Sequence, residues 1–497
     1  MTSLLLLPEV QLTLWAIFLL VVECCRREIT LDEVALMALL GIGLVLAGTW
    51  LQPLLLPGVE AVPGAISPFY TVDALAIFFK RFFLVSTFLV VWMAREHAAQ
   101  LPIARHEFLI LPLFTTVGML LLASARDFMT LFVALELITV SFYVLVAYQR
   151  DRAASLEAGT KYLVVGALST GFLVYGIAFI FGTVGGTSFK ALEVYLVTQP
   201  LTPALMLGML LVLSALGFKV AAVPFHAWAP DVYQGAPAPV SAFLSVASKA
   251  AGVVAFLRLF AFGGFMNNKM YPYIAGTLAV LGALTVLLGN LAAMPQRNLK
   301  RMLGYSSIGN AGFILMGLSC LSAPGVQAVL VYLGVYLIAT LLAFFILVLL
   351  ARDGASEDIP QLAGLYRRSP LLATGLTVAL VSLAGIPPLA GFLGKLGIFA
   401  AIWLPGSATV PGNNWLLIPA IIGAVAGLYF YLGPVRSMFW NEPMRDAAPV
   451  PVRPSSRLLV VVLAALLVIL GFWQQPLADL VAPVLGPVPG SPVSSAR

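Results

Sequence analysis

Runs of roughly 20 apolar residues recur from one end of the chain to the other, separated by polar or Pro/Gly-rich breaks. Each run is long enough to cross about 30 Å of hydrocarbon as a helix. The runs do not alternate apolar and polar residues, as the strands of a membrane barrel do. The pattern therefore predicts an all-α polytopic membrane protein with about 14 transmembrane helices, near 4–23, 34–52, 72–93, 107–123, 127–148, 157–182, 203–229, 240–262, 273–294, 300–321, 326–350, 370–403, 415–440 and 457–474.

The composition supports this prediction. Of the 497 residues 61% are hydrophobic and 10% charged, whereas soluble domains carry about 25% charged residues. The first apolar run lacks the basic flank and small-residue cleavage site of a signal peptide, so we expect it to remain as a spanning helix. Three cysteines, Cys24, Cys25 and Cys320, show no metal-binding or disulfide spacing, and a redox role for the vicinal pair stays open.

The basic residues in the loops predict an orientation. With each loop numbered by the helix before it, odd loops hold sixteen basic residues and even loops three, Arg126, Lys190 and Lys269. Loops rich in Lys and Arg stay in the cytoplasm. We therefore expect odd loops in the cytoplasm, or its topological equivalent, and both termini on the outer side of the membrane. The net charge of +6 thus reports orientation and indicates no nucleic-acid partner. The sixteen residues are Arg26, Arg27, Arg95, Arg105, Arg150, Arg152, Arg297, Lys300, Arg301, Arg352, Arg367, Arg368, Arg436, Arg445, Arg453 and Arg457.

Eight charged residues lie inside the apolar runs. A charge at the centre of a spanning helix costs about 2.5–3.5 kcal/mol on insertion scales, so several of them indicate an ion path. Glu136, Lys219 and Lys249 fall near the middle of their runs. Snorkelling towards the membrane surface remains an alternative for some of the others. The eight are Lys80, Arg81, Glu136, Lys161, Lys219, Lys249, Arg258 and Lys395.

Lysine and glutamate suit a proton path because their proton affinities respond to neighbours. Burial lowers the pKa of a lysine and a nearby carboxylate raises it again, whereas arginine does not release its proton. A single Glu–Lys pair could also be a fixed salt bridge that locks helix packing. One buried acid cannot neutralise four lysines, which favours a relay. His226 titrates near neutral pH and is a further candidate, with a packing role as its alternative.

Prolines lie beside two of these lysines. Pro224 follows Lys219, and Pro387 and Pro388 precede Lys395. Proline removes a backbone hydrogen bond, and broken membrane helices are typical of ion sites that line hydrated cavities. A simple packing kink is the alternative at each position. We predict breaks in the seventh and twelfth helices.

Three long motifs carry a family resemblance. The chain resembles the antiporter-like membrane subunits of respiratory complex I and of multisubunit cation/proton antiporters from about residue 70 to 440. In detail it is most similar to the N-type subunits of proton-translocating NADH:quinone oxidoreductase. The motifs are FKVAAVPFHAWAPDVYQGAPAPVSAFLSVASK (218–249), NLKRMLGYSSIGNAGF (298–313) and SLAGIPPLAGFLGK (382–395).

The resemblance implies two inverted five-helix repeats, helices 4–8 and 9–13, with helices 7 and 12 broken. It divides the chain into helices 1–3 (1–105), a first repeat (106–263), a second repeat (264–440), and helix 14 with a disordered tail (441–497). It also implies a relay in which Glu136 of the fifth helix pairs with Lys219, and whose other lysines are Lys161 of the sixth helix, the central Lys249, and Lys395 near the exit.

The resemblance further implies that redox chemistry in other subunits drives the protons. We expect no cofactor or metal on this chain, which has no dinucleotide motif beside a strand, no P-loop and no Cys-rich cluster. Quinone, FMN and iron–sulfur clusters would belong to partner subunits. The expected neighbours are M-type, K-type and J-type membrane subunits and lipids. Two alternatives remain, a subunit of a Na⁺/H⁺ antiporter and a scaffold that moves no ions.

Overall fold

A computed structural model describes seven stretches of the chain. The expected disordered tail (486–497) and the loop residues Arg27, Arg352 and Arg445 lie outside them. The described stretches are 6–26, 28–55, 66–261, 269–351, 357–403, 413–442 and 450–485.

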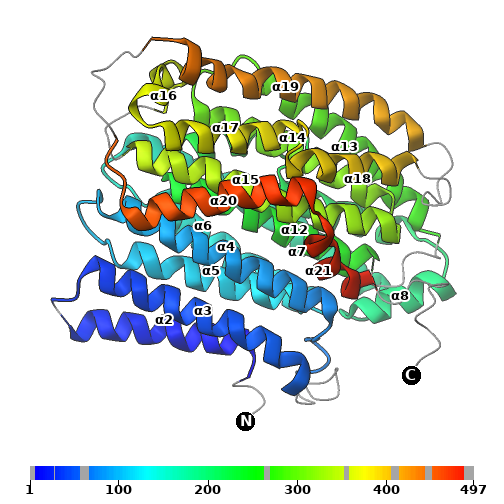
Figure 1. The fold of residues 1–497 in the computed structure, drawn as a ribbon. Coiled ribbons are helices and arrows are strands. Elements are labelled where there is room, and N and C mark those ends of the chain that lie inside the picture. Colours follow the sequence, from blue (N-terminus) through cyan, green and yellow to red (C-terminus); the bar gives the residue numbers. More distant parts are fainter. Residues whose placement is uncertain are drawn as a thin grey trace.

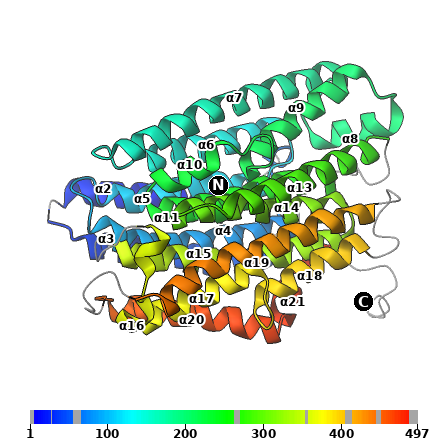
Figure 2. The same cartoon turned by 90° about the horizontal axis from the view of Figure 1, so that it is seen from above.

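The described chain is a bundle of helices whose axes run roughly side by side (Figure 1). The view from above places α7 at one edge and α20 and α21 at the opposite edge (Figure 2). The first part of the bundle comprises α2 (Pro8–Cys25), α3 (Leu31–Leu55), α4 (Ala74–Ala98), α5 (Glu107–Ala123), α6 (Phe128–Val146), α7 (Ala153–Val184) and the short α8 (Phe189–Thr198).

The middle part contains the first predicted break. α9 (Pro203–Val220) ends early, and the chain resumes in α10 (Trp228–Gly235). The eighth predicted span then forms from α11 (Ala238–Phe243), a π-helical turn η2 (Leu244–Ser248), α12 (Lys249–Phe256) and a second π-helical turn η3 (Leu257–Ala261).

The remaining part contains the second predicted break, between α17 and α18. Its helices are α13 (Tyr271–Ala293), α14 (Leu299–Ser319), α15 (Ala323–Ala351), η5 (Ile359–Leu362), α16 (Leu365–Arg368), α17 (Pro370–Ala384), α18 (Ala390–Trp403), η6 (Asn413–Leu416), α19 (Leu417–Trp440), α20 (Pro454–Phe472) and α21 (Gln475–Leu485).

The all-helical membrane prediction is confirmed. Eleven helices in the described ranges are long and apolar enough to cross a membrane. Four further apolar helices there are shorter, α5, α17, α18 and α21. The number of fourteen spans stays a prediction. The sequence pattern did not predict α8 or α21, which are short and lie at the same end of the bundle (Figure 1).

Polar residues at the ends of the apolar runs start several helices. The Asp73 carboxylate accepts a hydrogen bond from the Ala76 amide at 2.8 Å, and Asp127 accepts one from Thr130 at 2.8 Å. These side chains satisfy amides that have no partner within the helix. The capping residues therefore fix where α4 and α6 begin.

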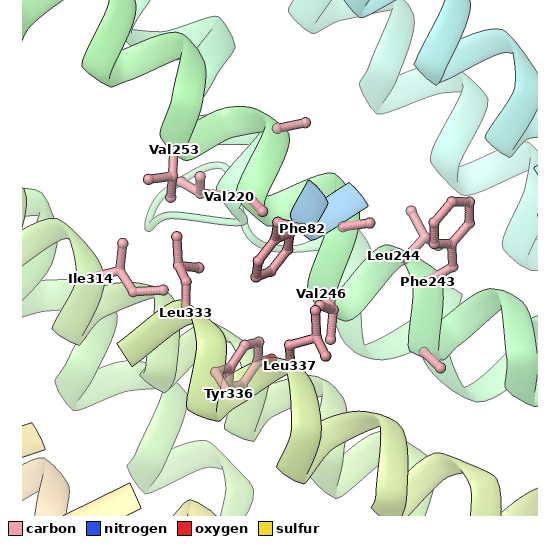
Figure 3. Close-up of a cluster of buried hydrophobic side chains, with 14 of the residues drawn as sticks. Phe82, Val220, Phe243, Leu244, Val246, Val253, Ile314, Leu333, Tyr336 and Leu337 are labelled. Carbon is pink, nitrogen blue, oxygen red and sulfur yellow. The ribbon is translucent and has the colours of Figure 1, made fainter. Parts of the chain in front are cut away.

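The centre of the bundle is formed by the η2–α12 span and by α15. The span Ala238–Phe260 is 100% buried and the α15 span 89% buried, whereas α7 and α20 are each 28% buried. Figure 3 shows apolar side chains of several helices meeting around Val246, Leu333 and Leu337. The outer helices therefore face the membrane or neighbours, and the central span is enclosed by protein.

Two of the charged residues that could have snorkelled are buried and paired. The Lys80 ammonium lies 2.9 Å from Glu9 of α2 and 2.6 Å from the Tyr70 hydroxyl, and its side chain is 0% exposed. Arg258 binds Asp73 through two nitrogens, at 2.5 and 2.7 Å. The snorkelling alternative is therefore wrong for Lys80, whose side chain is 0% exposed, and stays open for Arg258, whose partner Asp73 is 42% exposed at the start of α4.

Replacing Glu9 by glutamine should destabilise the bundle. The variant leaves the buried Lys80 ammonium without its carboxylate, and breaking a buried pair in this way costs about 3–5 kcal/mol. Thermal unfolding of the purified protein measures the effect. Glu28→Gln, at an exposed position, is the matched control. Equal midpoints for both variants would contradict a stabilising role for the Glu9–Lys80 pair.

Candidate functional site

Three lysines from the predicted relay lie in the protein interior, and we call Lys219, Lys249 and Lys395 the core lysines. Their exposed fractions are 7%, 1% and 5%. Burying an ammonium is costly unless other groups stabilise the charge. The contacts of each core lysine therefore show what the site can do.

Lys219 lies in the last turn of α9 and donates a hydrogen bond to the Thr139 hydroxyl of α6. Thr139 follows Glu136 by three residues, which places it about one helical turn away. The Glu136 carboxylate itself accepts a hydrogen bond from Thr170 of α7 at 2.7 Å. In the described part of the chain no carboxylate lies within 4.0 Å of the Lys219 nitrogen. The expected direct pairing of Glu136 with Lys219 stays a prediction.

Lys249 comes directly after the π-helical turn η2. Its ammonium donates a hydrogen bond to the backbone carbonyl of Ser307 on α14. The Ser307 hydroxyl lies 2.9 Å from the Tyr336 hydroxyl and 3.1 Å from that of Ser245. Because π-helical turns occur often at functional sites, this one agrees with a central role for Lys249.

Lys395 binds the backbone at the second helix break. Its nitrogen lies 2.8 Å from the Leu383 carbonyl oxygen and 3.0 Å from that of Ala384. In a continuous helix these carbonyls would accept from residues 387 and 388, which are prolines without an N–H. The paired prolines thus free the two oxygens that hold the ammonium of Lys395.

The two helix breaks resemble each other in backbone conformation and in the position of a lysine. α9 ends before Ala221, whose φ is 58°, and α17 ends before Gly385, whose φ is 83°. Such left-handed residues commonly terminate helices. Lys219 lies in the last turn of one half-helix, and the Lys395 ammonium binds the last carbonyls of the other. The C-terminal end of a helix carries partial negative charge that stabilises a cation. The predicted breaks in helices 7 and 12 are confirmed.

Buried hydroxyl and amide groups of α14, α15 and α19 lie between the Lys249 and Lys395 regions. The Asn310 side-chain oxygen accepts from the Tyr332 hydroxyl at 2.6 Å, and its nitrogen lies 3.3 Å from Tyr431. Tyr332 packs against Gly394, next to Lys395, because a Cβ on that glycine would meet its ring at 2.7 Å. The hydropathy pattern did not predict this cluster. The polar residues Ser306, Ser307 and Asn310 on one face of an apolar helix could have indicated it.

Lys161 lies apart from the core lysines. Its side chain is 42% exposed and its nitrogen lies 2.6 Å from Glu157 and 2.7 Å from Asp231. Arg301 contacts the other oxygen of Asp231 at 2.6 Å. The prediction that Lys161 is one of four buried lysines is wrong for this position. A lysine near the start of a spanning helix reaches the carboxylate of a following connection more easily than the interior.

Asp231 lies on α10, between the two candidate spans that end at Val220 and begin at Ala238. Burial raises the pKa of its carboxyl. Hydrogen bonds from Lys161 and Arg301, together with their positive charges, lower the pKa by more than burial raises it, so the pKa of Asp231 lies below its ordinary value. Asp231 therefore stays ionised at neutral pH and holds both cations. The sequence analysis did not single it out.

His226 lies in the segment between α9 and α10 and is half-buried. Its Nδ1 atom is buried without a hydrogen-bond partner among the described residues.

Lys300, predicted to lie in a loop, is instead buried, with Glu357 at 2.9 Å and the Ala236 carbonyl at 2.8 Å. The sequence could not show this, because Glu357 lies 57 positions further along the chain.

Removing the prolines at the second break should weaken the site. In the double variant Pro387→Ala, Pro388→Ala, two restored amides compete with Lys395 for the carbonyls. Each charged hydrogen bond contributes about 1.5–3 kcal/mol, so we expect proton transport to fall about tenfold. Transport by the purified assembly in vesicles measures this. Pro324→Ala, at an exposed position in the first turn of α15, should leave transport unchanged, and an active double variant would contradict the role of the break.

The fold and the core lysines define a class of membrane protein with charged groups buried beside broken helices. Residues 125–411 match the family described as "NADH:quinone oxidoreductase/Mrp antiporter, TM". The chain belongs to this family, as its motifs led us to expect.

Individual relatives narrow the comparison. The chain is 41% identical over 413 residues to NADH-quinone oxidoreductase subunit N of Heliobacterium modesticaldum. The matched region covers 82% of this chain and 84% of that protein. A chain of respiratory complex I from Thermus thermophilus superposes with a TM-score of 0.75 at 32% identity, covering 95% of this chain and 98% of that one. A chain of the Mrp complex from Dietzia sp. DQ12-45-1b superposes with a TM-score of 0.82 at 20% identity, covering 97% of each chain. The last likeness shows a shared fold alone.

Proposed function

We propose that this chain is an N-type membrane subunit of an NADH:quinone oxidoreductase and moves protons through its interior. The core lysines beside two broken helices carry the proposal. Their identity as lysine matters, because a buried ammonium can release its proton when its surroundings change. The identity to a subunit N over most of the chain supports the same function.

In the proposed relay a proton passes from the Glu136 region to Lys219, then to Lys249, and leaves past Lys395. Thr139 supplies a hydroxyl near the first step. At the second step α12 approaches α9 closely, since a Cβ on Gly252 would lie 3.4 Å from the Lys219 Cβ. The Ser307–Tyr336 and Asn310–Tyr332 contacts provide hydroxyls for the third step. Water would complete the path. In this proposal two further residues act where protons enter the relay. Lys161 does so through its contact with Asp231, and His226 does so from its place at the first helix break.

The surroundings of the chain follow from the same proposal. The redox groups, FMN, iron–sulfur clusters and quinone, would lie on partner subunits, and this chain would hold no cofactor or metal. M-type, K-type and J-type subunits would be its neighbours in a bacterial inner membrane. Odd loops would face the cytoplasm and both termini the periplasm. Residues 106–263 and 264–440 would form the two inverted repeats, flanked by 1–105 and 441–497.

The test is proton transport by the purified native assembly in sealed vesicles. Adding NADH and quinone should acidify the vesicle side that corresponds to the outside, and hydrophilic subunits with iron–sulfur clusters should copurify. Transport that instead depends on a Na⁺ gradient, with no redox partners present, would support the antiporter function. An assembly without any ion transport would support the scaffold function.

A further inference from the structure

An apolar cavity of about 610 Å³ lies among α3, α4, α15 and α21. The proton relay uses none of its side chains, and the inference drawn from it does not rest on the proposed function. Most of its lining is apolar, as Gly334 and Leu337 of α15 and Leu477 and Leu480 of α21 illustrate. One cation, Arg81 of α4, also lines it.

Arg81 has no carboxylate partner within the described residues, unlike Lys80 and Arg258. Its Nε donates to the Thr49 hydroxyl at 3.2 Å and one terminal nitrogen to the Thr49 carbonyl at 3.2 Å. Its guanidinium lies over the Trp50 ring, 4.2 Å from the centroid. A guanidinium has five N–H donors, and two of its nitrogens bind within the described residues, so further donors can bind a ligand. Among the described residues no carboxylate neutralises its positive charge.

Asp73, the acid among the lining residues, does not neutralise Arg81. Asp73 lines the cavity, but both of its carboxylate oxygens bind Arg258, at 2.5 and 2.7 Å. As far as the structure describes it, the site therefore combines an apolar chamber with one positive charge that has no carboxylate partner. A ligand that fits it has apolar chains and an anionic group, which is the chemistry of a phospholipid.

The position of Arg81 in the bundle suits a lipid headgroup. Arg81 follows the first residue of α4 by seven positions, or about 10 Å along the helix. Trp residues and basic side chains of this kind lie at the boundary between headgroups and acyl chains. α21 turns away from the direction of α20 at one end of the bundle (Figure 1), and its Leu477 and Leu480 line the apolar part of the cavity.

We propose that this cavity binds a phospholipid, with the phosphate on Arg81 and an acyl chain between α15 and α21. Arginine binds phosphate through charge-assisted, often bidentate, hydrogen bonds. The lipid would join α21 to α4 and α15 and fill a chamber that the described residues leave open.

The experiment uses the whole assembly in vesicles that contain a phospholipid with a photoactivatable diazirine in its acyl chain. After irradiation, labelled peptides are mapped by mass spectrometry. Wild type should carry label on α15 or α21 near Gly334 or Leu477. Arg81→Gln should reduce this label about tenfold, because it removes a charge-assisted hydrogen bond. Arg81→Lys keeps the charge and should retain most of the label.

A second variant tests the apolar part of the cavity. Gly334 lines the cavity, and a Cβ there would press on Leu477 at 3.2 Å. Gly334→Leu therefore narrows the space beside α21 and should also reduce labelling. This variant decides the test if Arg81→Gln does not assemble. Arg436→Gln, an exposed arginine of α19 that does not line the cavity, is the matched control. Equal labelling in all variants, absence of label from the lining peptides, or cross-linking of a neighbouring subunit to them would overturn the proposal.

Discussion

Replacing Lys249 by arginine is expected to stop most proton transport while the protein still assembles. The ordinary pKa of arginine exceeds that of lysine by at least about 2 units, which makes its neutral form roughly a hundredfold rarer in the same surroundings. Lys249 is fully buried and donates to a backbone carbonyl, so arginine can keep the charge but cannot pass the proton on. We expect transport below about a tenth of wild type.

Proton uptake by vesicles, divided by the amount of assembled complex, measures this effect. Lys269 lies in a predicted loop, so Lys269→Arg makes the same chemical change outside the relay and should have no effect. Normal transport by Lys249→Arg would show that charge alone matters at this position, and the relay through Lys249 would then be wrong.

The second large effect is expected from Lys219→Ala. This variant removes the ammonium beside Thr139 and leaves a gap in the path between Glu136 and Lys249. Loss of a proton-transferring group typically lowers a rate by about 10²–10⁴-fold. We expect coupled electron transfer to fall at least about tenfold, and Glu136→Ala to have a similar effect.

Quinone reduction and proton transport should be followed together in the Lys219→Ala assembly. Lys190→Ala, which removes an exposed lysine that contacts Glu193, is the matched control. Thr139→Val distinguishes the contribution of the Lys219 ammonium from that of the Thr139 hydroxyl, because it keeps the lysine and removes only the hydroxyl. If Lys219→Ala assembles normally and pumps like wild type, the scaffold function gains and the relay fails.

Sequence patterns predicted the membrane fold and both helix breaks, because long apolar runs and prolines act locally. Lys219 and Lys395 could be assigned to these breaks since each lies within a few residues of its prolines. The finer role of Pro387 and Pro388 could not be predicted. Only the structure shows that the freed carbonyls of Leu383 and Ala384 turn towards Lys395.

Ion pairs between segments far apart in the chain could not be predicted from the sequence. Lys80 meets Glu9 across 71 positions, and Lys161 meets Asp231 across 70. A hydropathy pattern gives the depth of a charge but not the direction in which its helix faces. For this reason Lys161 was expected among the buried lysines, although its side chain reaches the connection at α10.

The complete enclosure of the span from Ala238 to Phe260 has a consequence for biogenesis. Such a segment carries an ammonium and contacts only protein in the folded state. Its insertion into lipid by itself, during synthesis at the ribosome, is therefore unfavourable. The span packs against α4, α5 and α9, which are made earlier, and against α15, which is made later. Ser307 of α14, also made later, accepts a hydrogen bond from Lys249. We therefore expect nascent chains that stop before α14 to depend on an insertase or chaperone, and to be degraded faster than chains that extend beyond α15.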